Sequence, residues 1–194
     1  MIEILTEIDQ KIFLFINSLA FPALDPVMLA LSSHWFWVPV YFSLAAWFIW
    51  KYRIKGLIPL GLLFLTLLIT DQTSVHLFKE VFERLRPCHE PGVMEKTRLV
   101  AATCGGQFGF VSSHAANSFG LAAVSNSLIR KRWYTWAIFI WAIIVSYSRI
   151  YLGVHYPGDI IGGMILGSIL AVIIVFIYNR TAKKYTENAK TQKA

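Results

Sequence analysis

Residues 159–178 read DIIGGMILGSILAVIIVFIY. This run holds one charged residue, and its length suits an α-helix that crosses a bilayer, which takes about 20 apolar residues. Residues 57–69 form a second apolar run, LIPLGLLFLTLLI. The two runs predict a helical membrane protein.

Further segments of the same kind lie on both sides of these runs. The third predicted span carries Ser, His and Asn side chains, so we expect it inside a bundle rather than facing lipid. Gly163 and Gly167 are spaced for close helix packing, with an incidental pair as an equal alternative. The five predicted spans are residues 27–50, 57–78, 112–129, 133–152 and 159–178.

The N-terminal segment, residues 1–22, has a different pattern. Its apolar residues recur at helical spacing and its charges fall on the other face. We expect an amphipathic helix lying in the membrane interface, with a short sixth span as the alternative. The apolar positions are Leu5, Ile8, Ile12, Phe15, Ile16 and Leu19. The predicted fold class is therefore all-α, a polytopic membrane helix bundle of five to six spans in one domain, residues 1–194.

The composition and the charge distribution support a membrane location. Of 194 residues, 56% are hydrophobic and 15% charged, whereas soluble domains carry about 25% charged residues. The net charge of +7 lies largely in basic clusters at 51–55, 130–132 and 180–194, each following an apolar stretch. Such clusters are typical of cytoplasmic anchors and argue against nucleic-acid binding. The loop 79–110, called the outer loop below, and the turn 153–158 are then both on the non-cytoplasmic side of the membrane.

The first polar segment, Lys79–Pro87, reads KEVFERLRP. Lys79 and Arg86 are seven residues apart and would share one face of a helix that Pro87 ends. Two cations on one face suit a phosphate group. Arg84 falls on another face, where we expect it to be solvated. Interfacial snorkelling of these cations is the alternative.

The second segment, Phe110–Asn117, reads FVSSHAAN. Ser112 or Ser113 can cap the third span, and a helix N-terminus is a natural anion site. His114, in the first turn, could donate a proton to a leaving oxygen. The alternative is a capping serine beside a buried, hydrogen-bonded histidine.

The third segment, Ser148–Asp159, reads SRIYLGVHYPGD. Asp159 follows His155 by four residues, and a carboxylate bonded to one ring nitrogen leaves the other free to attack phosphorus. Arg149 adds a cation. The alternative is that Asp159 caps a helix and His155 is a surface residue. Together the three segments offer the charge neutralisation and positioning that phosphoryl transfer requires.

These motifs resemble those of the type 2 phosphatidic acid phosphatase superfamily, which includes the vanadium haloperoxidases. Its first motif is Lys, six residues, then Arg-Pro, which this chain matches at Lys79, Arg86 and Pro87. Its third motif is Ser-Arg, five residues, His, three residues, Asp, which this chain matches at Ser148, Arg149, His155 and Asp159. Its second is Pro-Ser-Gly-His, which this chain matches at Ser112 and His114 but not at Val111 and Ser113. The resemblance covers residues 79–159.

The resemblance implies a role for each site residue. His155 would be the nucleophile, oriented by Asp159, and His114 would protonate the leaving group. The family's phosphatases need no metal, and we expect neither a metal nor another cofactor. The residues implied to bind phosphate are Lys79, Arg86, Ser112, Ser113 and Arg149.

Cys88 and Cys104 are the two cysteines of the chain, and both lie in the outer loop. An oxidising periplasm would permit a disulfide between them, worth about 3 kcal/mol in the chain-entropy model. Two free thiols are the alternative.

The predicted function is hydrolysis of a phosphate monoester or diphosphate on a lipid at the periplasmic face of an inner membrane. The substrate candidates are lipid A 1-phosphate, undecaprenyl diphosphate, phosphatidylglycerol phosphate and phosphatidic acid. A transporter or binding protein for a phosphorylated lipid is the alternative. The sequence leaves the substrate and the oligomeric state open.

Overall fold

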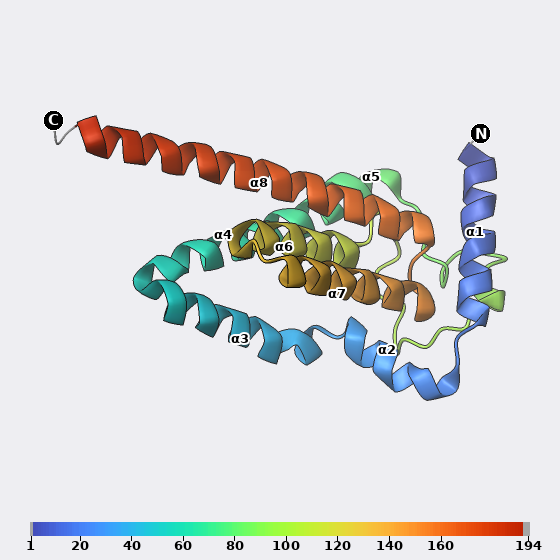
Figure 1. Ribbon diagram of the computed structural model, residues 1–194. Coiled ribbons are helices and arrows are strands. Elements are labelled where there is room, and N and C mark those ends of the chain that lie inside the picture. Colours follow the sequence, from blue (N-terminus) through green and yellow to red (C-terminus); the bar gives the residue numbers. More distant parts are fainter. Residues whose placement is uncertain (1, 192–194) are drawn as a thin grey trace.

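The computed structural model describes the backbone of residues 2–191 and the side chains of residues 3–183. Within this part the chain is helical without a β-strand, which confirms the predicted all-α class (Figure 1). The elements are α1 (Ile2–Ser18), α2 (Asp25–Ser32), α3 (His34–Tyr52), α4 (Leu57–Gln72), the π-helical η3 (Thr73–Lys79), α5 (Glu80–Phe82), α6 (Ser113–Ile129), α7 (Arg132–Tyr151) and α8 (Pro157–Thr191), with 3-10 turns at Pro22–Leu24, Arg53–Gly56 and Met94–Lys96.

Helix α6 lies at the centre of the bundle and packs against α4, α7 and α8. The predicted close packing at the two α8 glycines is confirmed. A Cβ at Gly163 would lie 2.5 Å from the carbonyl oxygen of Ser112, and one at Gly167 would overlap the carbonyl oxygen of Ala116. Several polar side chains of α6 are paired inside the bundle, as for Asn117, which accepts a hydrogen bond from Thr70 Oγ1 at 2.6 Å.

The first predicted span, residues 27–50, is not one helix. It is interrupted at Ser33, where α2 ends and α3 begins. Helix α3 lies at the edge of the bundle, and Phe48 is the one buried residue among its 19, all of which the structure describes. The span therefore has a break near the same end of the bundle as the polar segments.

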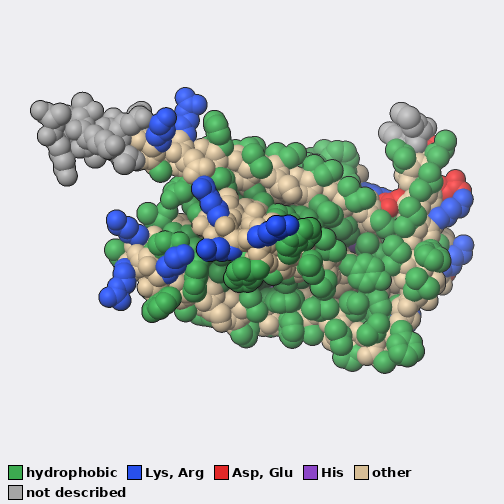
Figure 2. All heavy atoms as spheres, viewed as in Figure 1, with side chains coloured by type: hydrophobic (Ala, Val, Ile, Leu, Met, Phe, Trp, Pro, Cys, Tyr) green, Lys and Arg blue, Asp and Glu red, His purple; other side chains and the backbone are tan. Residues whose placement is uncertain are grey.

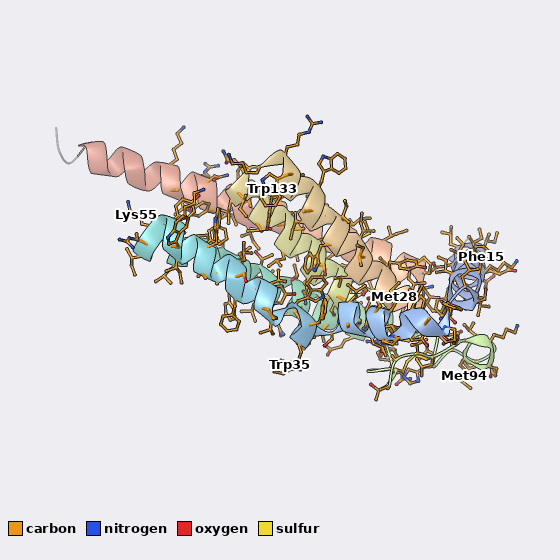
Figure 3. All side chains as sticks on the ribbon, turned by 60° about the horizontal axis from the view of Figure 1, so that its bottom comes forward. Phe15, Met28, Trp35, Lys55, Met94 and Trp133 are labelled. Carbon is orange, nitrogen blue, oxygen red and sulfur yellow. A yellow bond between two sulfur atoms is a disulfide. The ribbon has the colours of Figure 1, made fainter. Side chains whose placement is uncertain are left out.

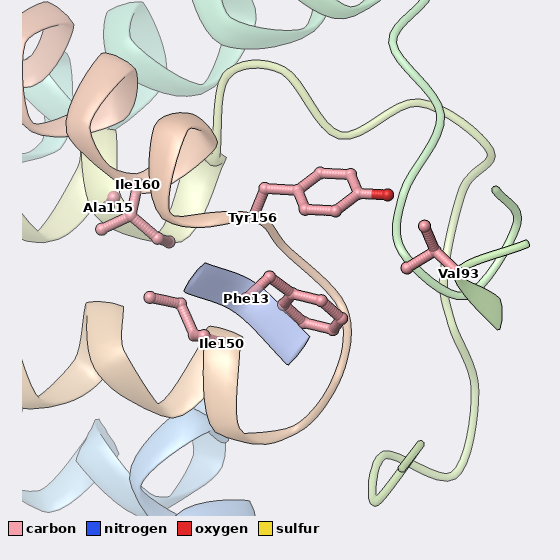
Figure 4. Packing of buried hydrophobic residues seen from close by; sticks show 6 residues of the cluster. All are labelled: Phe13, Val93, Ala115, Ile150, Tyr156 and Ile160. Atoms are coloured by element: carbon pink, nitrogen blue, oxygen red, sulfur yellow. The ribbon is translucent and has the colours of Figure 1, made fainter. Parts of the chain in front are cut away.

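Helix α1 lies across the end of the bundle rather than along it (Figure 1). The segments 3–18 and 22–32 meet at 88°. Four of the six predicted apolar positions are exposed on α1, and Leu19 is exposed just beyond its end. Phe13, on another face of the helix, is buried. Phe13 packs edge-on against Tyr156, with ring centroids 5.3 Å apart (Figure 4). An exposed apolar face on a transverse helix suits the predicted interfacial position.

Two helical stretches of the described chain are each long and apolar enough to cross a membrane, residues 34–82 and 157–183. The bent pair 3–18 and 22–32 makes a third if it is one span. Two features of the structure account for part of the difference from the predicted five to six. The stretch 34–82 folds back at Arg53–Gly56, so it contains both α3 and α4 (Figure 1). Helix α6 has only 17 residues and carries polar groups that face other helices.

Most of the Lys and Arg side chains that Figure 2 shows lie over the half of the molecule away from α1. Lys55 and Trp133 lie toward this end, whereas Phe15 and Met94 lie at the other (Figure 3). The predicted basic tail, residues 180–194, belongs partly to α8, but its side chains beyond residue 183 lie outside the described residues. This separation is the one that the charge pattern predicts for a protein crossing a membrane.

Candidate active site

His155 and Asp159 lie at the junction of α7 and α8. His155 Nδ1 is 3.2 Å from Asp159 Oδ2, which also accepts the backbone N–H of Tyr156 at 3.0 Å. An ionised carboxylate only accepts hydrogen bonds, so Nδ1 carries the proton and Nε2 keeps a free lone pair. The pair therefore has the geometry of an oriented nucleophile.

Positive charge surrounds His155, whose residue surface is only 1% exposed. Burial and this positive charge hold the pKa of His155 well below its usual range, so that its imidazole is neutral at pH 7. The cations that act on it are Arg86, Arg149, Lys79 and Arg84. The three cations predicted to bind phosphate thus converge on the predicted nucleophile, and a fourth joins them.

The predicted helix over residues 79–87 is wrong in its length. Helix α5 ends at Phe82, and Glu83 takes a left-handed conformation with φ of 47°. The residues that follow, Pro87 included, are not helical. Lys79 and Arg86 therefore reach the site from different elements, not from one helix face.

The side chain of Arg86 is held by hydrogen bonds to backbone carbonyls within residues 104–108. Its Nε donates to the carbonyl of Phe108 at 3.1 Å and its Nη1 to the carbonyl of Cys104 at 3.0 Å. Its backbone N–H donates to the carbonyl of Gln107 at 3.1 Å. These bonds fix a guanidinium that is largely buried beside His155.

The N-terminus of α6 joins the other two motifs. Ser113 Oγ accepts a hydrogen bond from Lys79 Nζ at 2.6 Å and lies 2.7 Å from Ser74 Oγ. The backbone N–H of Ser112 donates to the carbonyl of Asp159 at 3.0 Å. The hydroxyl of Ser112 is buried and has no partner among the described residues.

His114 and Arg149 lie together beside the break between α2 and α3. The His114 ring lies over that of His34, with centroids 4.7 Å apart, and Arg149 Nη1 donates to Ser32 Oγ. The Nε of Arg149 is buried without a partner among the described residues. Buried donors normally have acceptors, and phosphate oxygens would supply them to Arg149 Nε and to the Ser112 hydroxyl.

A cavity of about 330 Å³ opens beside His114 and runs between α3, α4, α6 and α7. Its polar end holds His114 and Asp71. The rest of its wall is mainly apolar and includes Trp37, Tyr41, Phe64, Leu68 and Trp141. Such a cavity, apolar along its length and polar at one end, suits a ligand with an apolar tail and a polar head.

Residues 55–183, which include all three motif segments, match the model of the PAP2 superfamily. The chain belongs to the PAP2 superfamily. The match extends the predicted resemblance well beyond residues 79–159, and the two departures from the second motif leave Ser112 and His114 in place.

Individual PAP2 relatives cover most of the chain. A lipid A 4'-phosphatase of Bacteroides thetaiotaomicron is 38% identical over 93% of this chain and 81% of its own length. A lipid A 4'-phosphatase of Porphyromonas gingivalis is 35% identical over 92% and 77%. The crystal structure of a transmembrane PAP2-type phosphatidylglycerolphosphate phosphatase from Bacillus subtilis superposes with a TM-score of 0.68, at 23% identity over 91% of this chain and 87% of that one. The protein is thus a membrane-bound PAP2 lipid phosphatase, a hydrolase of phosphoric esters.

The position of Arg84 differs from the sequence-based prediction. The residue was expected to be solvated, but its Nη1 donates to Asp159 Oδ1 at 2.9 Å and its Nη2 to Asp9 Oδ2 at 2.7 Å. The expectation was wrong because α5 ends at Phe82, so helical periodicity does not set the direction of Arg84. Asp9, on α1, joins this cluster as well, and nothing local in the sequence links it to a residue 75 positions away.

We expect Gly109→Ala to lower kcat about 10-fold to 100-fold. A Cβ at Gly109 would lie 2.9 Å from Asp159 Oδ2 and 3.5 Å from His155 Nδ1, and misplacing a reacting group by about 1 Å can cost about 100-fold. Phosphate release by the purified variant measures the effect. Gly106→Ala in the same loop is the matched control, because a Cβ there meets nothing within 4 Å. Equal activity of the two variants would contradict the prediction.

Cys88 and Cys104 are joined by a disulfide in the structure, 16 residues apart in sequence. With His89 they form the one group of potential metal ligands among the described residues, and the disulfide occupies both sulfurs. The bond closes the loop whose Cys104 carbonyl holds Arg86.

Replacing both cysteines by serine should therefore lower stability by about 3 kcal/mol and also lower phosphate release, because the acceptor of Arg86 becomes mobile. Thermal unfolding in detergent and phosphate release, with and without a reductant, measure both effects. Unchanged activity in the fully reduced protein would show that the loop holds Arg86 without the bond.

Proposed function

We propose that this PAP2 protein removes a phosphate group from a lipid of the lipid A type through a phosphohistidine intermediate. The observation that carries the proposal is the buried His155–Asp159 pair, with Nδ1 and Oδ2 3.2 Å apart, inside a ring of cations. A neutral imidazole with one nitrogen tied to a carboxylate is a competent nucleophile.

In the first step the phosphate oxygens are held by positive charge and by hydrogen-bond donors. His155 Nε2 attacks phosphorus, the P–N bond forms, and the bond from phosphorus to the lipid oxygen breaks. His114, which becomes protonated when the phosphate dianion binds beside it, donates its proton to that oxygen, so the lipid leaves as an alcohol. The groups that hold the phosphate are Lys79, Arg86, Arg149, the Ser112 hydroxyl and the backbone amides that begin α6, while Ser113 orients Lys79.

In the second step a water molecule attacks phosphorus and the P–N bond breaks. His114, now unprotonated, accepts a proton from that water, and inorganic phosphate leaves. Asp159 stabilises the positive charge that His155 carries while it is phosphorylated. The surrounding cations balance the charge that spreads over the phosphate oxygens in both steps.

The substrate class is proposed from the cavity and from the relatives. The apolar wall between α3, α4, α6 and α7 suits an acyl chain whose head reaches His114. The two curated relatives described above are lipid A 4'-phosphatases, so lipid A phosphate is placed first among the candidates.

The test offers the purified protein a panel of phosphorylated lipids in the presence of a chelator. The panel holds lipid A with 1- and 4'-phosphates, undecaprenyl diphosphate, phosphatidylglycerol phosphate and phosphatidic acid. We expect the highest kcat/KM with lipid A, and a clearly faster release from another lipid would replace this substrate. Lipid binding and transport without phosphate release would support the transporter alternative.

We further propose an inner-membrane protein whose site faces the periplasm. Most Lys and Arg side chains in view lie over the half of the molecule away from α1 (Figure 2), whereas α1 contacts the site through Asp9 and Arg84. The positive-inside rule places the cytoplasm at the basic end. The disulfide near the site also suits an oxidising compartment.

A further inference from the structure

Asp9, on α1, is linked to the His155–Asp159 pair through Arg84. Arg84 bridges two carboxylates, with Nη1 2.9 Å from Asp159 Oδ1 and Nη2 2.7 Å from Asp9 Oδ2. Asp9 also accepts the backbone N–H of Gly158 through Oδ1 at 2.8 Å. A continuous chain of hydrogen bonds therefore runs from α1 to His155.

Every member of this chain is shielded from solvent to some degree. The side chain of Arg84 is 24% exposed, that of Asp9 14% and that of Asp159 0%. The Arg84 guanidinium also lies 4.4 Å from the centroid of the Tyr156 ring. Ion pairs in such surroundings are screened less than surface pairs and are held in one geometry.

The contacts at Asp159 show why this geometry matters. Its Oδ2 serves His155 and the backbone of Tyr156, so its Oδ1 depends on Arg84 for a side-chain partner. Without Asp9, Arg84 would keep a single carboxylate partner and could rotate about its long side chain. The carboxylate of Asp159, and with it the imidazole of His155, would lose a fixed orientation.

We propose that Asp9 is a positioning residue that acts through Arg84 to orient Asp159 and His155. The role rests on the proposed function of His155 as the nucleophile. Through Asp9, the transverse helix α1 would support the geometry of the active site while its apolar face stays exposed.

The kinetic test compares Asp9→Asn with Glu7→Gln. Both changes remove one carboxylate charge from α1, but Glu7 is exposed and pairs with Lys11, at 2.7 Å, away from the site. We expect Asp9→Asn to lower kcat about tenfold with KM within about twofold, similar to the loss of activity when a residue that orients a metal ligand is removed. Glu7→Gln should leave both kcat and KM unchanged. The probes are the best lipid of the panel and 4-nitrophenyl phosphate.

A double-variant cycle separates action through Arg84 from a general effect on folding. If Asp9 acts through Arg84, Asp9→Asn should cost nothing further in an Arg84→Met background. Gly158→Ala gives a second route to the same effect with all charges kept, because a Cβ there would lie 2.6 Å from Asp9 Oδ2. It should also lower kcat with little change in KM.

A readout without substrate keeps this proposal separate from the proposed function. In protein labelled with ¹⁵N-histidine, His155 should be the Nδ1–H tautomer in wild type and a mixture in Asp9→Asn. An inactive wild type with this tautomer change would reject the proposed function and keep the positioning role. An unchanged tautomer together with unchanged kcat, or additive effects in the cycle, would overturn the positioning role.

Discussion

His155→Ala is expected to lower phosphate release at least about 10⁴-fold, equivalent to about 5.5 kcal/mol of activation free energy. The reason is that the variant has no nitrogen to form the P–N bond, and the remaining cations bind the phosphate without transferring it. Release of inorganic phosphate from the lipid measures kcat. Trapping labelled phosphate on the protein as an acid-labile adduct measures the intermediate, which should be absent in the variant.

His76→Ala is the matched control for this experiment. His76 is exposed and pairs with Glu80 at 3.0 Å on the protein surface, so removing it should leave kcat unchanged. An active His155→Ala protein, or a labelled adduct that persists in it, would show that another residue attacks phosphorus.

His114→Asn is expected to lower release from a lipid about 100-fold to 10⁴-fold, the range that general acid catalysis contributes. A lipid alkoxide is a poor leaving group and needs the proton that His114 supplies. With 4-nitrophenyl phosphate the loss should be much smaller, because its leaving group departs without a proton. Equal losses with the two substrates would place His114 in phosphate binding and not in proton transfer.

The third motif could be predicted well from the sequence because its chemistry is local. His155 and Asp159 are four residues apart, and the start of α8 places them within hydrogen-bonding distance. The helical class and the central place of α6 followed from apolar length and from the polar residues within one span. Both inferences depend on spacing within a single segment, which a sequence shows directly.

The position of Arg84 could not be predicted in this way. The end of α5 depends on the left-handed conformation of Glu83 and on the loop bonds of Arg86, and apolar periodicity shows neither. The partnership of Arg84 with Asp9 joins residues 75 positions apart. Long-range pairs of this kind arise from the way helices assemble, so a single sequence gives no sign of them.

The edge helix α3 forms part of the apolar cavity wall but carries none of the residues proposed to hold the phosphate. The groups proposed to hold the phosphate lie on η3, α6, α7 and the outer loop, whereas α3 forms a side of the cavity with Phe48 as its one buried residue. Changes in the number or length of the substrate's acyl chains should therefore act mainly on KM. The speed of the chemical step should follow the leaving group instead.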